Sequence, residues 1–166
     1  MAESELHRTI KNQAIGYLWN KGFYIARTEV RDHYYGIVDA WGIRPRDLYT
    51  MAIEVKVSRS DWLAAKHKDY KTEEMAKHMH NGWTSSNEVY YACPSGLISP
   101  EEVSPSVGLL WFNGNRFVSK KKPRFVQVHL KDKMQTMLNI YEPWSTAFPQ
   151  PQGQHIRSTL SIKATP

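Results

Sequence analysis

The chain has only one cysteine, Cys93, among its 166 residues. A single thiol excludes an intrachain disulfide framework, and the apolar surroundings of Cys93 in YYACP predict a buried thiol to which we assign no chemistry. No apolar run reaches the roughly 18 residues that a membrane span requires. The first residues, MAESELHRTIKNQ, lack the basic and then apolar layout of a secretory signal. We therefore expect a cytoplasmic protein with no membrane partner.

What is present is the composition of one globular domain with a basic charge. Hydrophobic residues make up 41% and charged residues 23% of the chain, as in a folded soluble domain. The 22 Lys and Arg residues exceed the 16 Asp and Glu residues, which gives a net charge of +6. Such a charge favours a polyanion such as DNA. A merely solvated basic surface is the equal alternative at this point.

Hydrophobic periodicity and turn residues predict a mixed α/β (α+β) order of elements. We expect helices at 4–20, 60–79 and 131–141, strands at 23–30, 34–42, 48–57 and 87–94, one helical turn after Pro100, and a hairpin around Asn113 and Gly114. A second short hairpin should join the strands at 34–42 and 48–57. From 143 the sequence turns to Pro, Gln, Ser and Thr, so we divide it into a domain at 1–142 and a loosely ordered tail at 143–166.

The strand MAIEVKV carries the pattern that points to chemistry. A period of two places Ile53, Val55 and Val57 on one face, which we expect to be core, and leaves Ala52, Glu54 and Lys56 on the other. The neighbouring strand includes Asp39, which can bring a second carboxylate to the same place.

Two carboxylates are oxygen ligands of the kind that Mg²⁺ or Mn²⁺ takes, and the backbone carbonyl of Val55 could add a third oxygen. Lys56 could orient the attacking water or stabilise developing negative charge, so the pattern predicts hydrolysis of phosphodiesters. The alternative is a solvated Glu–Lys pair, because a short E-x-K pattern on a half-exposed strand is common.

The same residues resemble a known superfamily. Asp39, followed by Glu54-Val55-Lys56 in a strand and preceded by an amphipathic helix, resembles the PD-(D/E)XK nuclease signature. The strings EVKVSRSDW and YYACPSGLISPEEVSPSVGLL, with the lysine and tyrosine of AAKHKDY, are similar to the MmcB-like DNA repair branch and its phage relatives. The similarity runs from about Glu5 to Phe112. The superfamily's proline before the aspartate is replaced by Val38, which removes no ligand.

The resemblance implies a restriction-endonuclease-like core, in which a mixed central sheet is flanked by helices. It implies Asp39 and Glu54 as metal ligands, Lys56 as the catalytic lysine, and a Mg²⁺- or Mn²⁺-dependent deoxyribonuclease, specifically an endonuclease, in DNA repair, recombination or phage DNA metabolism. The alternative function is a catalytically weak or inactive nuclease-fold module that binds DNA within a larger complex. A third is a basic protein-binding domain, which would leave the convergence of these residues unexplained.

Two further acidic residues are outside candidates for the metal site. Glu5 stands where resolvase-like nucleases carry a helix glutamate near the metal, but it also suits the first turn of a helix, where a negative charge is favourable. Glu29 is a comparable candidate. A homodimer stays open because resolvase-like relatives need two sites to cut two strands, and partner proteins of repair or replication stay open too.

Two basic clusters are candidates for contact with the DNA backbone. The candidate residues are Arg59, Lys66, Lys68, Tyr70 and Lys71 on the second predicted helix and, further along, Lys120, Lys121 and Lys122, followed by Arg124. Both clusters could equally be solvated faces, and neither would read a sequence. We do not predict zinc, because His67, His78 and His80 have neither the spacing nor the cysteine partners of structural zinc sites.

Overall fold

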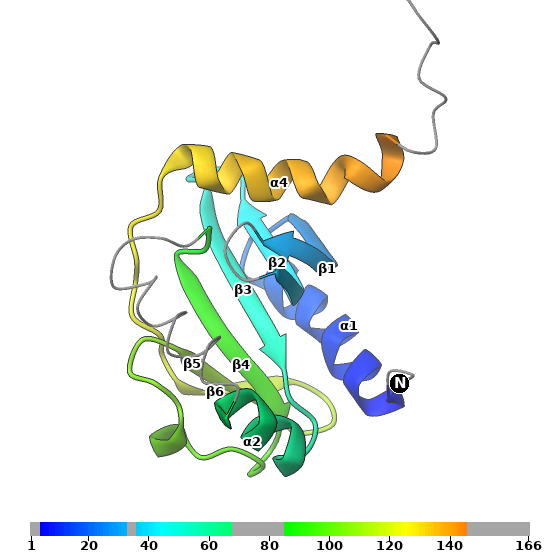
Figure 1. Cartoon of the computed structure of the whole chain (residues 1–166), viewed down its shortest axis with the longest axis vertical. Helices are drawn as coiled ribbons and strands as arrows, with labels where there is room; N and C mark the ends of the chain where they lie inside the picture. Colours follow the sequence, from blue (N-terminus) through cyan, green and yellow to red (C-terminus); the bar gives the residue numbers. More distant parts are fainter. Residues whose placement is uncertain (1–3, 33–35, 68–84, 146–166) are drawn as a thin grey trace, which may run out of the picture.

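A computed structural model describes residues 4–32, 36–67 and 85–145 of the chain. Its centre is a six-stranded sheet in the order β1-β2-β3-β4-β5-β6, with helices packed against it (Figure 1). The elements are α1 (Glu5–Asn20), β1 (Ile25–Asp32), β2 (Gly36–Arg44), β3 (Tyr49–Val55), α2 (Arg59–His67), β4 (Glu88–Pro94), the 3₁₀ turn η1 (Pro100–Glu102), β5 (Gly108–Phe112), β6 (Phe117–Lys121) and α4 (Leu130–Ser145).

The strand directions make the sheet mixed. β1, β2 and β3 are successively antiparallel, β3, β4 and β5 are parallel, and β6 returns antiparallel to β5. The predicted α+β class with a mixed central sheet flanked by helices is therefore confirmed. Both predicted hairpins are present, and Gly114 in the second adopts a φ of +93°, which a residue without Cβ adopts without strain.

Helix α1 covers one face of the sheet. It begins where the Ser4 hydroxyl accepts a hydrogen bond from the backbone N–H of His7 at 3.2 Å, a standard N-cap. Ile10, Ala14 and Leu18 recur every four residues and are fully buried. They pack with apolar residues of β3, β4 and β5, so this face of the sheet is a closed core. The polar first turn of α1 lies near Asp39, which His7 contacts.

A second core fills the other face and corrects one expectation. Ala52, on the same face of β3 as Glu54, is 1% exposed and packs in a cluster with Trp41, Trp62 and Tyr91. The prediction that this whole face is chemical was wrong, because α2 and the segments after β6 cover it and a central strand next to a parallel neighbour is buried on both sides. Only the end of β3 is left for chemistry.

The ends of some elements differ from the prediction. β1 begins two residues later than expected, the expected start of β2 at 34 lies outside the described residues, and α4 continues through Pro143 to Ser145 instead of ending at Tyr141. The second predicted helix begins as α2, but its continuation to 79 lies outside the described residues. Cys93 is buried as predicted, and burial raises the pKa of its thiol to about 11. Within the described ranges no helix is long and apolar enough for a bilayer span.

Candidate active centre

Asp39 occupies the point where β2 and β3 separate. The two strands pair as far as Ala40 and Ile53, and the next residues in this register are Asp39 and Glu54. Beyond this pair the Asp39 side chain, and not the backbone of β2, bonds to β3. Its Oδ2 atom accepts a hydrogen bond from the backbone N–H of Val55 at 2.7 Å. The main chain of β3 therefore fixes the Asp39 carboxylate.

The backbone carbonyl of Val55 belongs to the same place. The N–H of Lys56 donates to the Ala92 carbonyl of β4 at 2.9 Å, so Lys56 directs its N–H away from β2. Successive residues of a strand direct their N–H and C=O groups to opposite sides. We infer that the Val55 carbonyl, like its N–H, is on the β2 side, where Asp39 lies.

Glu54 and Lys56 form an ion pair beside this point. Lys56 Nζ lies 3.1 Å from Glu54 Oε1 and 3.8 Å from Asp61 Oδ1, and the lysine side chain is only 11% exposed. Burial lowers the pKa of Lys56, but the charges of Glu54, Asp61 and Asp39 outweigh it, and the pKa is raised above its usual value. Lys56 is consequently an ammonium at neutral pH, so it can hold or neutralise an anion but cannot accept a proton.

Asp61 is a member of this centre that was not predicted from the sequence. The Ser58 hydroxyl accepts a hydrogen bond from the Asp61 N–H at 3.1 Å and so caps the start of the helix. The cap starts α2 directly after β3, and this brings the Asp61 carboxylate to Lys56. The three-residue spacing of Ser58 and Asp61 is typical of a helix cap, and this signal could have predicted that Asp61 lies close to the end of the preceding strand.

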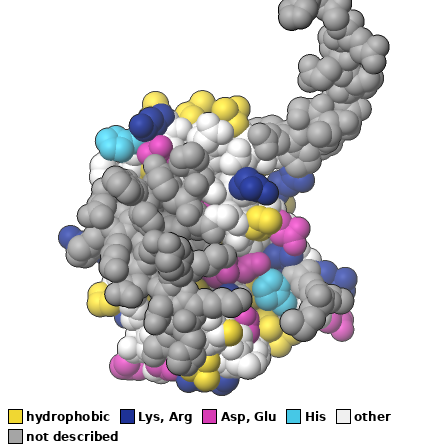
Figure 2. Space-filling view, viewed as in Figure 1, with side chains coloured by type: hydrophobic (Ala, Val, Ile, Leu, Met, Phe, Trp, Pro, Cys, Tyr) yellow, Lys and Arg dark blue, Asp and Glu magenta, His cyan; other side chains and the backbone are white. Residues whose placement is uncertain are grey.

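His7 is a second residue that the sequence analysis missed. Its Nε2 atom lies 3.5 Å from Asp39 Oδ1, which places an imidazole from α1 against the candidate metal ligand. In the view of Figure 2, acidic and basic side chains lie next to one another on the right half of the molecule. His7 and Lys11 are one turn apart on α1, so one helix face directs both toward the ends of the strands.

Lys11 binds the outside candidate Glu29. Lys11 is 5% exposed, and its Nζ lies 2.6 Å from Glu29 Oε1. Glu29 lies in β1 between residues that pair with Val38 and Ala40, across from Asp39, and has a φ of +55°, which is strained for a residue with a side chain. The backbone of Glu29 is thus across from Asp39, and one oxygen of its carboxylate is held by a lysine.

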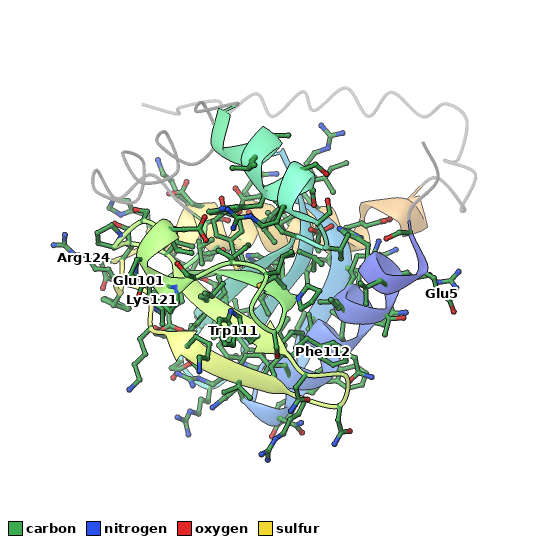
Figure 3. The ribbon with its side chains drawn as sticks, turned by 90° about the horizontal axis from the view of Figure 1, so that it is seen from below. Glu5, Glu101, Trp111, Phe112, Lys121 and Arg124 are labelled. Carbon is green, nitrogen blue, oxygen red and sulfur yellow. The ribbon has the colours of Figure 1, made fainter. Side chains whose placement is uncertain are left out.

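Glu5 does not join these residues. It is exposed in the first turn of α1, and Figure 3 shows its side chain pointing away from the body of the protein. This position fits the alternative interpretation, in which Glu5 interacts favourably with the positive end of the helix. His7, two residues later, is the α1 side chain that reaches Asp39.

Arg59, a candidate for DNA contact, is engaged within the protein. Its guanidinium donates to both carboxylate oxygens of Glu102 at 2.8 and 2.9 Å and to the Leu97 carbonyl at 3.0 Å. This bidentate pair joins the start of α2 to η1. The hydrogen bonds with Arg59 lower the pKa of Glu102 to about 2, so the pair is ionised at neutral pH.

The second basic cluster is divided by the alternation of β6. Lys121 points inward and donates to the backbone carbonyls of Pro100 and Val103, which makes it a structural tie (Figure 3). Lys120 is exposed and lies over the Trp111 ring, 4.5 Å from its centroid. Lys122 is also exposed. The structure therefore leaves Lys120 and Lys122 for contact with a polyanion.

The remaining candidates cannot be placed in the same way. Lys66 belongs to α2, and its side chain is not among those described. Lys68, Tyr70 and Lys71 lie outside the described residues.

The candidate ligands of this centre are oxygen atoms, which hard cations such as Mg²⁺ prefer. Asp39, Glu54 and the Val55 carbonyl are oxygen donors, and Mg²⁺ often takes only one or two carboxylates with water and substrate phosphate completing its shell. Across 4–32, 36–67 and 85–145 no group of three or more His, Cys, Asp and Glu side chains has a metal-holding arrangement. The fit therefore rests on two carboxylates and one carbonyl.

The comparisons with known proteins found a similar fold but no known function. No family model and no curated protein matches the chain. Among solved structures, the chain is similar to the SPO1766 protein of unknown function from Silicibacter pomeroyi, with a TM-score of 0.62 and 18% sequence identity over 94% of this chain and 99% of that one. At this identity the likeness shows a shared fold alone.

Proposed function

We propose that the chain is a Mg²⁺- or Mn²⁺-dependent deoxyribonuclease that hydrolyses phosphodiester bonds, in which Asp39 and Glu54 hold the metal and Lys56 is the catalytic lysine. The observation that carries the proposal is the convergence of these three side chains where β2 and β3 separate. Burying an ammonium group costs desolvation free energy, which a close ion pair can offset. A buried lysine between carboxylates therefore indicates either such a structural ion pair or a functional role. DNA repair, recombination or phage DNA metabolism in the cytoplasm is the proposed setting.

In this proposal each residue of the centre has its own role. A bound ion would neutralise charge on the scissile phosphate and lower the pKa of a bound water. Asp39, fixed by the Val55 N–H, and Glu54 would hold that ion. Lys56 stays charged and would stabilise negative charge on the attacking or phosphoryl oxygen. Asp61 is a positioning residue, since it holds the lysine from the side of α2.

The test is cleavage of single-stranded, duplex and branched DNA with added Mg²⁺ or Mn²⁺. We expect metal-dependent cutting that chelator abolishes and that Lys56→Ala reduces on the order of 100-fold or more. Lys131→Ala is the matched control, because it removes the same charge from the exposed start of α4. Equal cutting by wild type and the folded Lys56→Ala variant would overturn the proposal.

A non-cleaving DNA-binding module is the second candidate. It is favoured by the lysines that already bind two of the carboxylates, Lys56 on Glu54 and Lys11 on Glu29. In such a module the ion pairs would be structural, and the DNA affinity would depend steeply on salt but not on metal. Intact DNA with all three substrates and both metals, together with tight binding, would support this candidate over the nuclease.

A further inference from the structure

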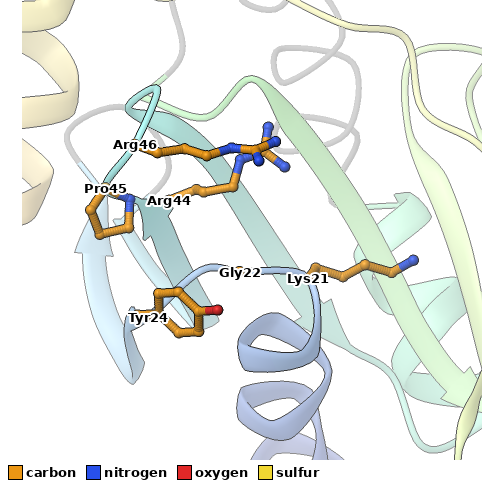
Figure 4. Close-up of a pocket in the computed structure, with 6 residues that line it drawn as sticks. All are labelled: Lys21, Gly22, Tyr24, Arg44, Pro45 and Arg46. Atoms are coloured by element: carbon orange, nitrogen blue, oxygen red, sulfur yellow. The ribbon is translucent and has the colours of Figure 1, made fainter.

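A cavity lies at the end of the sheet away from Asp39. It has a volume of about 450 Å³ and lies among the end of α1, the start of β3 and β4, and the segment after β6. A second pocket of about 300 Å³, drawn in Figure 4, is lined by Lys21, Gly22, Tyr24, Arg44, Pro45 and Arg46. Both pockets use Lys21 and Arg44, so they adjoin, and we call the two together the basal groove.

The basal groove is separate from the candidate active centre. Tyr49 lines the groove at the start of β3, whereas Glu54 is near the end of the same strand. Five residues of a strand span about 17 Å. The groove also uses Tyr17 near the end of α1 and Lys21 directly after it, whereas the active centre uses His7 near the start of α1.

The groove has an excess of positive charge. Arg44 and Arg46 share one carboxylate, with Arg44 Nη2 2.8 Å and Arg46 Nε 3.6 Å from Asp47 Oδ2. Figure 4 shows the ends of the two arginine side chains close together. Arg46 is 78% exposed. Lys21 and Lys122 add two further ammonium groups to the lining, against the carboxylate of Glu88. The balance favours an anionic ligand.

Exposed aromatic rings accompany these charges. The Tyr24 side chain is 73% exposed at the wall of the groove. Phe125 is 52% exposed and stacks on Tyr49, with ring centroids 5.8 Å apart and an angle of 28° between the planes. Arg44 lies over Tyr49, 4.9 Å from the ring centroid, and so holds that ring in place. Flat, accessible rings held next to cations are the surfaces on which unpaired bases stack.

The floor of the larger cavity offers polar groups as well. Burial, together with the adjacent carboxylate of Glu88, raises the pKa of Tyr49 and Tyr90 above its usual value, so both hydroxyls remain protonated. Glu88 therefore places a carboxylate next to both tyrosine hydroxyls. A carboxylate and tyrosine hydroxyls can bond the polar edge of a base whose Watson–Crick partner is absent.

We infer that the basal groove binds single-stranded nucleic acid. Bases would stack on Tyr24 and on Phe125, while phosphates would contact Lys21, Arg46 and Lys122. A duplex keeps its bases stacked inside and could use only the charges, so the rings favour an unpaired strand. The inference goes beyond the proposed nuclease, because it concerns binding about 17 Å from the metal ligands and requires no cleavage.

The test is binding of a fluorescent 12-nucleotide oligothymidine to the full chain in the presence of chelator, followed by fluorescence anisotropy. Loss of one stacked base lowers affinity by about fivefold to more than a hundredfold, and Tyr24→Ala should fall in this range. Arg46→Ala should lower the slope of log affinity against log salt by about 0.7, the value for one phosphate contact of a single strand. Both side chains are exposed, so neither variant should unfold the chain.

Arg116→Ala is the control, since it removes the same charge from the exposed turn between β5 and β6. An unchanged affinity and salt slope in this variant, with losses in the two groove variants, would support the inference. Equal binding by all four proteins, no measurable binding of the oligonucleotide, or equal Tyr24→Ala losses on duplex and single strand would overturn it. An oligouridine of equal length decides whether the strand is DNA or RNA. Failure of cleavage would not affect these results, because no metal is present.

Discussion

At the scale of the residue, Asp39 has a structural and a chemical role that substitutions can separate. Its carboxylate satisfies the buried N–H of Val55 at 2.7 Å. Asp39→Asn keeps an oxygen that can accept this bond, whereas Asp39→Ala leaves the donor without its partner, which costs about 1–3 kcal/mol. We expect Asp39→Ala to unfold at a clearly lower urea concentration than Asp39→Asn, while both variants lose metal-dependent cutting. Equal stability of the two variants would contradict the role of this hydrogen bond.

Lys56 yields a prediction about alkaline pH. Its pKa in the folded state is raised above 10.5, so its ion pairs stabilise the fold fully below the unfolded value and lose this effect as the pH rises through the folded value. The stability difference between wild type and Lys56→Met should therefore be constant from pH 7 to about 10 and change above that. Urea unfolding at a series of pH values measures it. A change between pH 7 and 9 would show that Lys56 is not held as an ammonium.

The pattern E-x-K after an aspartate predicted three residues of the centre, because strand alternation and a short hairpin are local features that place Asp39, Glu54 and Lys56 together. His7 could not be found in this way, since its contact with Asp39 depends on how α1 packs across the sheet. For Lys121 the sequence predicted a contact with DNA that its position in the structure does not favour. A run of lysines looks uniformly basic, but β6 turns Lys121 inward to backbone carbonyls.

At the scale of the element, β5 depends on a residue without a side chain. A Cβ atom at Gly108 would lie 2.4 Å from the ring of Tyr90 and 2.9 Å from Pro123. Gly108→Ala should therefore destabilise the fold by about 1–3 kcal/mol through overpacking. Chemical denaturation of Gly108→Ala in the wild-type and Tyr90→Val backgrounds tests the cause, because the cost should shrink when the ring is absent.

Gly16 provides the opposite case and the control. It lies within α1, and a Cβ atom there would meet nothing within 4 Å. Gly16→Ala should stabilise the fold by about 0.4–1 kcal/mol, because alanine loses less conformational freedom in a helix. If both glycine substitutions destabilised equally, crowding at Tyr90 would not be the explanation for Gly108.

At the scale of the whole molecule, the order of elements was predictable and the covering of the sheet was not. Periodicity and turn residues are local, so the mixed sheet and both hairpins could be predicted from them. The burial of Ala52 requires Trp62 from α2 and Tyr91 from β4 to pack on β3. The basal groove is likewise assembled from α1, β2, β3, β4 and the segment after β6, and no single stretch of sequence carries its pattern.

The tie between α2 and η1 joins distant parts of the chain and should govern part of the acid stability. The pKa of Glu102 is lowered from 4.5 to about 2, first by its hydrogen bonds with Arg59 and then by the Ser99 N–H. A lowered pKa contributes stability above pH 4.5 that is lost as the pH falls toward 2. Wild type should thus exceed Glu102→Gln in stability at pH 6, and the difference should shrink steadily as the pH falls from about 4.5 to 3.

Urea unfolding of both proteins between pH 3 and 7 measures this difference, and Arg59→Met provides the complementary control. Because the arginine and the carboxylate act as one pair, Glu102→Gln should cost little in the Arg59→Met background, and its dependence on pH should weaken there. A pH-independent difference between wild type and Glu102→Gln would mean that the hydrogen bonds, and not the charge of Glu102, hold α2 to η1. The start of α2 carries Asp61, so loosening this tie should also reduce the restraint on Lys56.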